Sequence, residues 1–133
     1  MRLALFALLA GCLPQDSTGG ECTTDRDCSG SVCTRDEQCT PASEVRSVKL
    51  TWTVAGNPAT AESCAGMSDL FVQLEGESAI DVIGWAPVPC AQGQFNIDKL
   101  PTRFGIAELG IEGAVGDRVR IDSAHTAHFD LFP

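Results

Sequence analysis

From residue 45 onward, apolar and polar residues alternate with the two-residue period of a half-buried β-strand. The first run places four apolar residues on one face: Val48, Leu50, Trp52 and Val54. Further β-rich runs follow at 69–75, 80–86, 94–98, 104–111, 118–122 and 127–132. Gly, Pro, Asn and Asp residues that favour turns separate most of them. About seven short strands spaced in this way predict a mainly β protein, with an antiparallel β-sandwich over residues 45–133.

One interruption of the strand pattern predicts a short helix over residues 57–66. Asn57 is a favourable N-cap, Pro58 follows at the first helical position, and Gly66 is a C-terminal stop. Because a helix of two turns is marginal by itself, we expect a disulfide between Cys64 and Cys90 to pin it to the strands. Two buried free thiols are the alternative for this pair.

Residues 21–40 have a different character, because cysteines take the place of apolar residues. Cys22, Cys28, Cys33 and Cys39 form a C-x5-C-x4-C-x5-C pattern, and Val32 is the only large apolar residue among them. Such a segment buries too little apolar surface to fold without cross-links, so it is predicted to be rich in disulfides. Three pairings are open from the sequence. We favour Cys22–Cys33 with Cys28–Cys39, because interleaved pairs make the more compact knot.

Two metal sites are the alternatives for this cysteine-rich segment. A zinc site of four thiolates needs reduced cysteines and usually has them in close C-x2-C pairs, which are missing here. Asp25, Asp27, Asp36 and Glu37 offer carboxylates for calcium, but no D-x-D-x-D-G loop holds them. We therefore expect neither a metal nor a cofactor, and we expect these carboxylates to be solvated groups in turns.

The first twelve residues have the pattern of an export signal. Arg2 precedes an apolar run from Leu3 to Ala10, which is too short to cross a bilayer as a helix. The following Leu9-Ala10-Gly11-Cys12 resembles the lipobox of bacterial lipoproteins. This resemblance implies that residues 1–11 are a signal peptide and that Cys12 carries the lipid. Residues 12–20 then form a flexible tether. A buried strand that ends at a core cysteine is the alternative.

The lipobox resemblance implies that the membrane is one partner of the chain, through acyl chains on Cys12. Two or more acyl chains hold a protein stably at a bilayer, whereas one does not. Leu13 follows the lipidated cysteine where Asp favours retention in the inner membrane, so we expect the outer membrane. The spacing of the next four cysteines resembles short cysteine-rich repeats, compared with the Dickkopf amino-terminal domain, that follow the lipobox in many Gram-negative surface lipoproteins.

The charge balance makes one class of partner improbable, and the cysteine count favours an exported protein. The 133 residues include nine Lys and Arg against 18 Asp and Glu, a net charge of −9 that repels nucleic acid and anionic lipid headgroups. We therefore expect no nucleic-acid partner. Seven cysteines are ordinary for an exported chain. The odd number is explained if Cys12 is acylated and the other six form three disulfides.

A second resemblance concerns the stretch from Cys90 to Phe104. Its Phe95-Asn96-Ile97 followed by Leu100-Pro101 resembles the F-x-I/L…L-P-x-G-x-Y stretch of transthyretin-like and carboxypeptidase-regulatory-like sandwiches. Phe104 stands where those domains have Tyr, and Arg103 displaces the usual glycine. The resemblance implies a sandwich in which a short turn joins two core strands. It implies no activity, because such domains host many functions.

Few residues suggest chemistry. His125 and His128 are the only histidines, and on a strand residues three apart point to opposite faces. Trp52 shares its face with aliphatic residues and is predicted to lie in the core, whereas Trp85, at a strand end, is the candidate ligand contact. We therefore predict a non-enzymatic, lipid-anchored envelope protein with a protein or glycan partner. A carbohydrate- or calcium-binding module is the first alternative, and a metal-dependent enzyme that uses the two histidines is the second.

Overall fold

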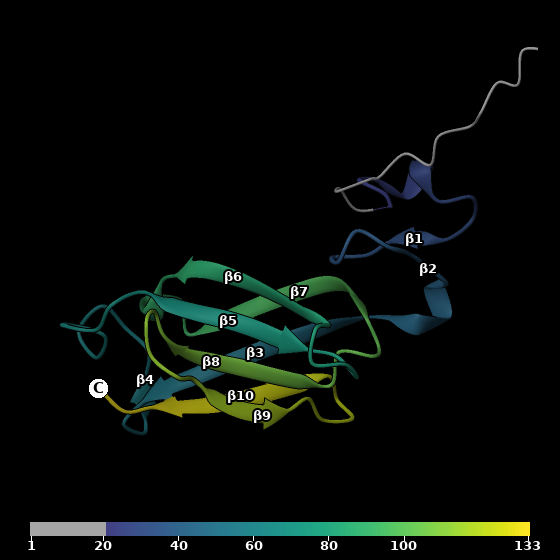
Figure 1. Cartoon of the computed structure of the whole chain (residues 1–133). Coiled ribbons are helices and arrows are strands. Elements are labelled where there is room, and N and C mark those ends of the chain that lie inside the picture. Colours follow the sequence, from purple (N-terminus) through teal and green to yellow (C-terminus); the bar gives the residue numbers. More distant parts are fainter. Residues whose placement is uncertain (1–20) are drawn as a thin grey trace, which may run out of the picture.

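The computed structural model describes residues 21–133. They form a small disulfide-linked segment, residues 21–40, which we call the module, and a β-sandwich that begins at Val45 (Figure 1). The module contains the 3-10 turn η1 (Asp25–Asp27) and an antiparallel ladder of β1 (Val32–Cys33) and β2 (Cys39–Thr40). A second 3-10 turn, η2 (Ala42–Glu44), leads into the sandwich. The expected mainly β class is confirmed. Within residues 21–133 no helix is long and apolar enough to cross a membrane.

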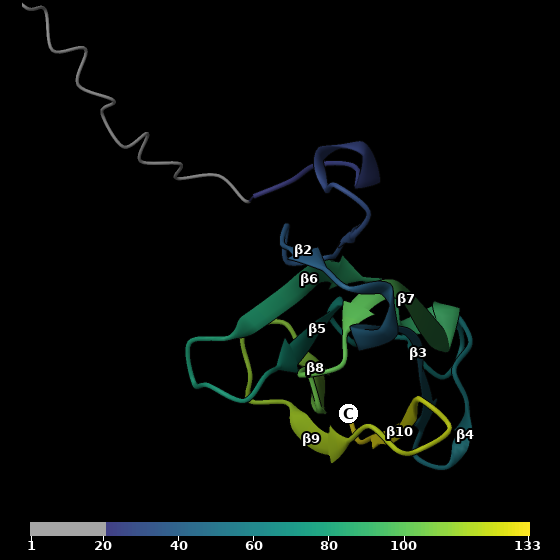
Figure 2. The same ribbon diagram turned by 90° about the vertical axis from the view of Figure 1, so that its right-hand side faces the viewer.

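The sandwich consists of two sheets that face each other (Figures 1 and 2). Its strands are β3 (Val45–Val54), β4 (Asn57–Pro58), β5 (Leu70–Glu75), β6 (Val82–Val88), β7 (Gln94–Pro101), β8 (Ile106–Ile111), β9 (Asp117–Arg120) and β10 (Thr126–Leu131). In the first sheet β3 is central, with β10 on one side and β7 and the short β4 on the other. The second sheet has the order β6-β5-β8-β9.

One strand pair departs from a purely antiparallel sandwich. β10 runs parallel to β3, in a register that extends from Thr126 opposite Lys49 to Leu131 opposite Val54. All other strand pairs of residues 21–133 are antiparallel. Alternation of apolar residues predicts which side chains face the core but not the direction of the neighbouring strand. For that reason the parallel pair could not be predicted from the sequence pattern.

The core follows the predicted alternation. In β3 the side chains of Val48, Leu50, Trp52 and Val54 are all buried between the sheets. The second sheet contributes the alternate apolar residues of β5 and β8, which are Leu70, Val72, Leu74, Ala107 and Leu109. The indole N–H of Trp52 donates a 2.7 Å hydrogen bond to the carbonyl of Cys90. This bond satisfies the polar group of the largest core side chain, as burial requires.

The helix expected over residues 57–66 is not formed. Asn57 and Pro58 pair with β3 as β4, and residues 61–66 form consecutive turns. The Ser63 hydroxyl donates to the Pro58 carbonyl (2.8 Å) and accepts from the Thr60 N–H (2.9 Å). Such local side-chain bonds compete with helical hydrogen bonds. Pairing with β3 therefore extends the backbone at Pro58, where the sequence pattern predicted the first turn of a helix.

Candidate functional site

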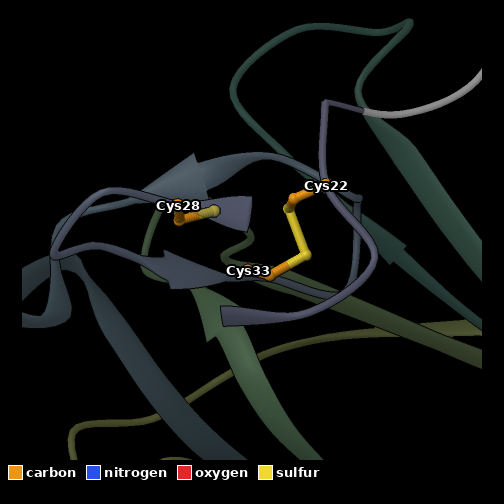
Figure 3. A group of neighbouring side chains, drawn as sticks. All are labelled: Cys22, Cys28 and Cys33. Atoms are coloured by element: carbon orange, nitrogen blue, oxygen red, sulfur yellow. A yellow bond between two sulfur atoms is a disulfide. The ribbon is translucent and has the colours of Figure 1, made fainter. Parts of the chain in front are cut away.

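Three disulfides join the six cysteines of the described residues. In the module, Cys22 is bonded to Cys33 and Cys28 to Cys39, each pair with a sequence separation of 11. Figure 3 shows Cys28 beside the Cys22–Cys33 bond. The third disulfide joins Cys64 to Cys90 across 26 positions. These are the pairs that the sequence analysis favoured.

The sulfur atoms of the module form one group. Those of Cys22, Cys28 and Cys33 lie within 4.8 Å of one another, and among residues 21–133 this is the one group of three or more His, Cys, Asp or Glu ligand atoms close enough to hold a metal ion. Zinc binds thiolates rather than disulfide sulfurs. In their bonded state these atoms therefore form the small core of the module, in place of aliphatic side chains.

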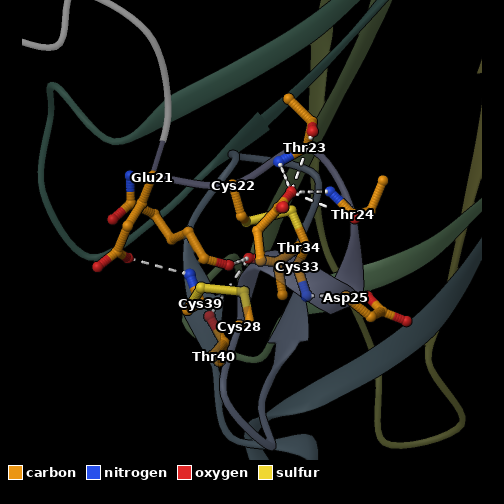
Figure 4. The surroundings of a disulfide bond; sticks show 12 residues. Glu21, Cys22, Thr23, Thr24, Asp25, Cys28, Cys33, Thr34, Cys39 and Thr40 are labelled. Atoms are coloured by element: carbon orange, nitrogen blue, oxygen red, sulfur yellow. Dashed lines mark hydrogen bonds between the residues drawn. A yellow bond between two sulfur atoms is a disulfide. The ribbon is translucent and has the colours of Figure 1, made fainter.

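Acidic side chains of the module accept hydrogen bonds from its backbone; Figure 4 shows two of these residues, Glu21 and Asp25, beside the disulfides. One carboxylate oxygen of Asp27 accepts hydrogen bonds from the backbone N–H groups of Thr23 (3.0 Å) and Thr24 (2.8 Å). These bonds lower the pKa of Asp27 from its ordinary 3.8 to about 2. Asp25 accepts from the N–H of Cys33 (3.0 Å), and Glu21 accepts from the N–H of Cys39 (3.1 Å). Each of these carboxylates therefore has a backbone N–H group of the module as its partner.

A β-bulge in β7 brings the sandwich into contact with the module. The register of β7 against β3 shifts so that Asp98 and Lys99 together lie opposite Ser47, and Lys99 has a positive φ of 51°. A bulge of this kind redirects the side chains that it carries. Asp98 pairs with Arg35 of the module, which lowers the pKa of Asp98, and Lys99 pairs with Asp25 at 2.8 Å.

Arg103 makes the most buried polar contact between the two parts. Its guanidinium pairs with Asp36 of the module and with Asp81 of the β5–β6 turn, the latter at 2.7 Å. The Asp36 side chain is only 9% exposed, and its other oxygen accepts from the Thr34 hydroxyl at 2.6 Å. The guanidinium carbon also lies 4.8 Å from the ring centroid of Phe104. One side chain therefore fixes the module, the β5–β6 turn and the β7–β8 turn.

The two histidines lie in different elements and have different hydrogen-bond partners. His128 is exposed on β10, where its Nδ1 lies 3.0 Å from the hydroxyl of Thr51. His125 lies in the β9–β10 turn with a positive φ of 62°, and its N–H donates to the carbonyl of Asp122. Among the residues the structure places, neither histidine belongs to a group of three metal-ligating side chains. Asp122 and Asp130 accept hydrogen bonds from nearby backbone N–H groups, which lower their pKa values.

Trp85, the candidate ligand contact, lies at the edge of the sandwich. It belongs to the edge strand β6 and is half-buried, and its ring centroid is 5.4 Å from that of Phe95 in the other sheet. The rings are tilted by 55°. The ring therefore packs partly against the core while one part stays accessible.

Sequence reasoning missed a groove on the outer face of the second sheet. Two turns border it, that between β5 and β6 and that between β8 and β9, and it encloses about 560 Å³. Its floor is formed by side chains that alternate with the core residues of β5 and β8, among them Gln73, Ile106 and Glu108. The only available signal was an apolar residue, Val115, in the turn between two predicted strands.

Comparison with protein-family models, with curated proteins and with solved structures finds no match for this chain.

Proposed function

We propose that this chain is a non-enzymatic lipoprotein of the bacterial envelope, anchored through Cys12 and binding a partner protein through its sandwich. The observation that carries the proposal is the cysteine balance. All six cysteines from Cys22 to Cys90 are joined in pairs, so the odd cysteine of the sequence is the one in the lipobox pattern. Cys12 and the tether, residues 12–20, lie outside the described residues. Disulfides in a small, core-poor module suit an oxidising compartment.

The contact between module and sandwich supports a role as a spacer. The module directly follows the tether, and it is held to the sandwich by the side chains of Arg35, Lys99 and Arg103 and by a backbone hydrogen bond. In Figures 1 and 2 the module lies beyond the sandwich edge where β6 and β7 are found. A fixed module between the anchored end and the sandwich would present the sandwich away from the membrane surface. We propose the outer membrane as the location, because Leu13 follows the lipobox cysteine.

We also propose that the cysteine-rich module and the sandwich are each related to a known family. The interleaved pairing of Cys22–Cys33 and Cys28–Cys39 supports a relation to the Dickkopf-like repeats of surface lipoproteins. The connection from β7 to β8, with Leu100 and Phe104 fully buried, supports a relation to transthyretin-like sandwiches.

A carbohydrate-binding module is the second candidate, and the half-buried Trp85 is the observation in its favour. An accessible indole can stack on the face of a sugar ring. Here, however, part of the Trp85 indole packs against the ring of Phe95. A glycan array probed with the wild type and with Trp85→Phe tests it. Glycan signals that fall in the variant would favour this candidate over a protein partner.

The anchoring step is tested by intact mass spectrometry of the membrane-extracted protein under non-reducing conditions. We expect a mass greater than that of the chain beginning at Cys12 by the attached lipid, and lower by the six hydrogens lost in three disulfides. Cys12→Ser should abolish both processing and lipid attachment and leave the disulfides intact. An uncleaved, cytosolic wild-type protein with free thiols would overturn the proposal.

A further inference from the structure

The groove on the second sheet is built by turns that fold down onto the outer face. The N–H of Gly116 donates a 3.0 Å hydrogen bond to the Glu108 carboxylate. A Cβ atom added at Gly110 would lie 2.6 Å from the Gly116 Cα, so the β8–β9 turn is packed closely against β8. On the other side the N–H of Gly76 donates to the carbonyl of Asp81 (2.7 Å), which closes the β5–β6 turn. Both walls of the groove therefore have a defined conformation.

Exposed apolar side chains lie in these two turns and at the start of β6. Val115 is 94% exposed, Ile80 is 92% exposed and Val82 is 40% exposed. They are three of the four large apolar side chains that are exposed among residues 21–133, and the fourth is Phe132. Val82 and Val115 line the groove together with Ile106 and Ala79, whereas Ile80 lines a neighbouring pocket beside the module. Grouped apolar side chains exposed at the rim of a groove are typical of an interaction surface.

The charge of the groove is negative. Its lining contains three carboxylates, Glu75, Glu77 and Glu108, and one cation, Arg118, which leaves a net charge of −2. Arg118 pairs with Glu75, and Glu108 accepts from Gly116. Glu77 is exposed and makes no hydrogen bond or ion pair with any residue in the described part of the chain. The groove thus offers an unpaired carboxylate beside an apolar wall.

We infer that this groove binds a short segment of a partner protein that carries both apolar and basic side chains. The inference rests on the proposed function as a binding protein and names its site. Apolar side chains of the partner would cover Val82, Val115 and Ile106, and a basic side chain would pair with Glu77. A volume of about 560 Å³ suits a few side chains rather than a whole domain.

The same features disfavour other occupants. Anionic lipid headgroups and a second copy of this chain, with its net charge of −9, are repelled by the carboxylates. The lining contains no aromatic ring on which a sugar would stack.

The test measures binding of short fluorescein-labelled peptides to the full-length, membrane-extracted protein by fluorescence anisotropy. In the first peptide Val and Lys alternate, in the second Val and Glu, and in the third Ser and Lys. We expect the Val–Lys peptide to bind at least about tenfold more tightly than either of the others. A similar affinity for the Ser–Lys peptide would mean plain charge attraction and would overturn the inference.

Variants with matched controls locate the binding. Val115→Ser and Glu77→Lys should each lower the affinity for the Val–Lys peptide at least about tenfold. Phe132→Ser removes another exposed apolar side chain, outside the groove, and Glu62→Lys makes the same charge change outside the groove. Neither variant should alter the affinity. Equal effects of groove variants and controls, or no binding of the Val–Lys peptide, would overturn the groove as the site. A lipidated protein that fails this test would leave the anchoring proposal standing, so the two failures are distinguishable.

Discussion

The backbone N–H of Arg35 donates a 3.1 Å hydrogen bond to the carbonyl of Lys99, and so joins the cysteine-rich module to the bulge of β7. The side chains of the same two residues reinforce this contact, since Arg35 pairs with Asp98 and Lys99 with Asp25. The module therefore has a specific place on the sandwich.

Arg103 should contribute most to this placement. Arg103→Gln would leave the nearly buried Asp36 carboxylate without its cation, so we expect the free energy of unfolding to fall by about 1–3 kcal/mol. Urea denaturation measures the loss, and amide hydrogen exchange should show reduced protection at residues 34–40. Arg118→Gln is the control, because its ion pair with Glu75 is more exposed and should be worth at most about 1 kcal/mol. Equal losses in the two variants would contradict this role.

The disulfide between Cys64 and Cys90 should stabilise the sandwich. It closes a loop with a sequence separation of 26, which corresponds to about 3.5 kcal/mol in the chain-entropy model. We expect the double variant Cys64→Ser, Cys90→Ser to lose about this amount in urea denaturation followed by tryptophan fluorescence. An unchanged denaturation midpoint would show that the turns of residues 59–69 hold their place without the cross-link.

The module should lose stability in acid. Because the pKa of Asp27 is lowered from 3.8 to about 2, the folded state favours the carboxylate over the protonated form. The stabilisation is therefore complete above about pH 4 to 5, and it is lost as the pH falls through 3.8 towards 2. Thermal unfolding of the wild type and Asp27→Asn between these pH values measures the effect. The midpoint of the wild type should fall more steeply; parallel curves would contradict the assignment.

Close packing of the β8–β9 turn predicts a contrast between two glycines. A Cβ at Gly110 would lie 2.6 Å from the Gly116 Cα and 2.8 Å from a ring carbon of Phe71, so Gly110→Ala should cost about 1–3 kcal/mol. Gly105 has no heavy atom within 4 Å of the same position, and Gly105→Ala should be neutral or slightly stabilising. Urea denaturation compares them. A Gly110→Ala variant as stable as Gly105→Ala would show that the turn moves away freely.

The strands could be predicted because the alternation of apolar and polar residues is visible within each short stretch of sequence. The alternation of Val48, Leu50, Trp52 and Val54 defines a buried face whatever lies opposite. The disulfide pairing of the module could also be predicted, since four cysteines in so short a segment allow only three pairings. The turns after β4 could not be predicted. Proline and serine are common at the start of a helix, but Pro58 and Ser63 equally suit the hydrogen bond that joins them here.

The contact between module and sandwich was beyond the sequence for a different reason. Arg103 and Asp36 are separated by 67 positions, and their pairing depends on the fold that brings them together. The bulge at Asp98 and Lys99 carries no sequence mark such as glycine, although Lys99 adopts a positive φ. The groove likewise depends on how two distant turns fold onto one sheet face.

The position of β10 beside β3 has a consequence for how the protein matures. Thr51 and His128, neighbours across this pair, are 77 positions apart, so the central strand gains its second neighbour only after nearly all of the sandwich sequence is available. Contacts between such distant segments form slowly. A nascent or clipped chain that lacks residues 126–131 would expose the edge of β3 to strands of other molecules. Residues 126–131 therefore cover an edge of β3 that would otherwise be open to pairing with other chains.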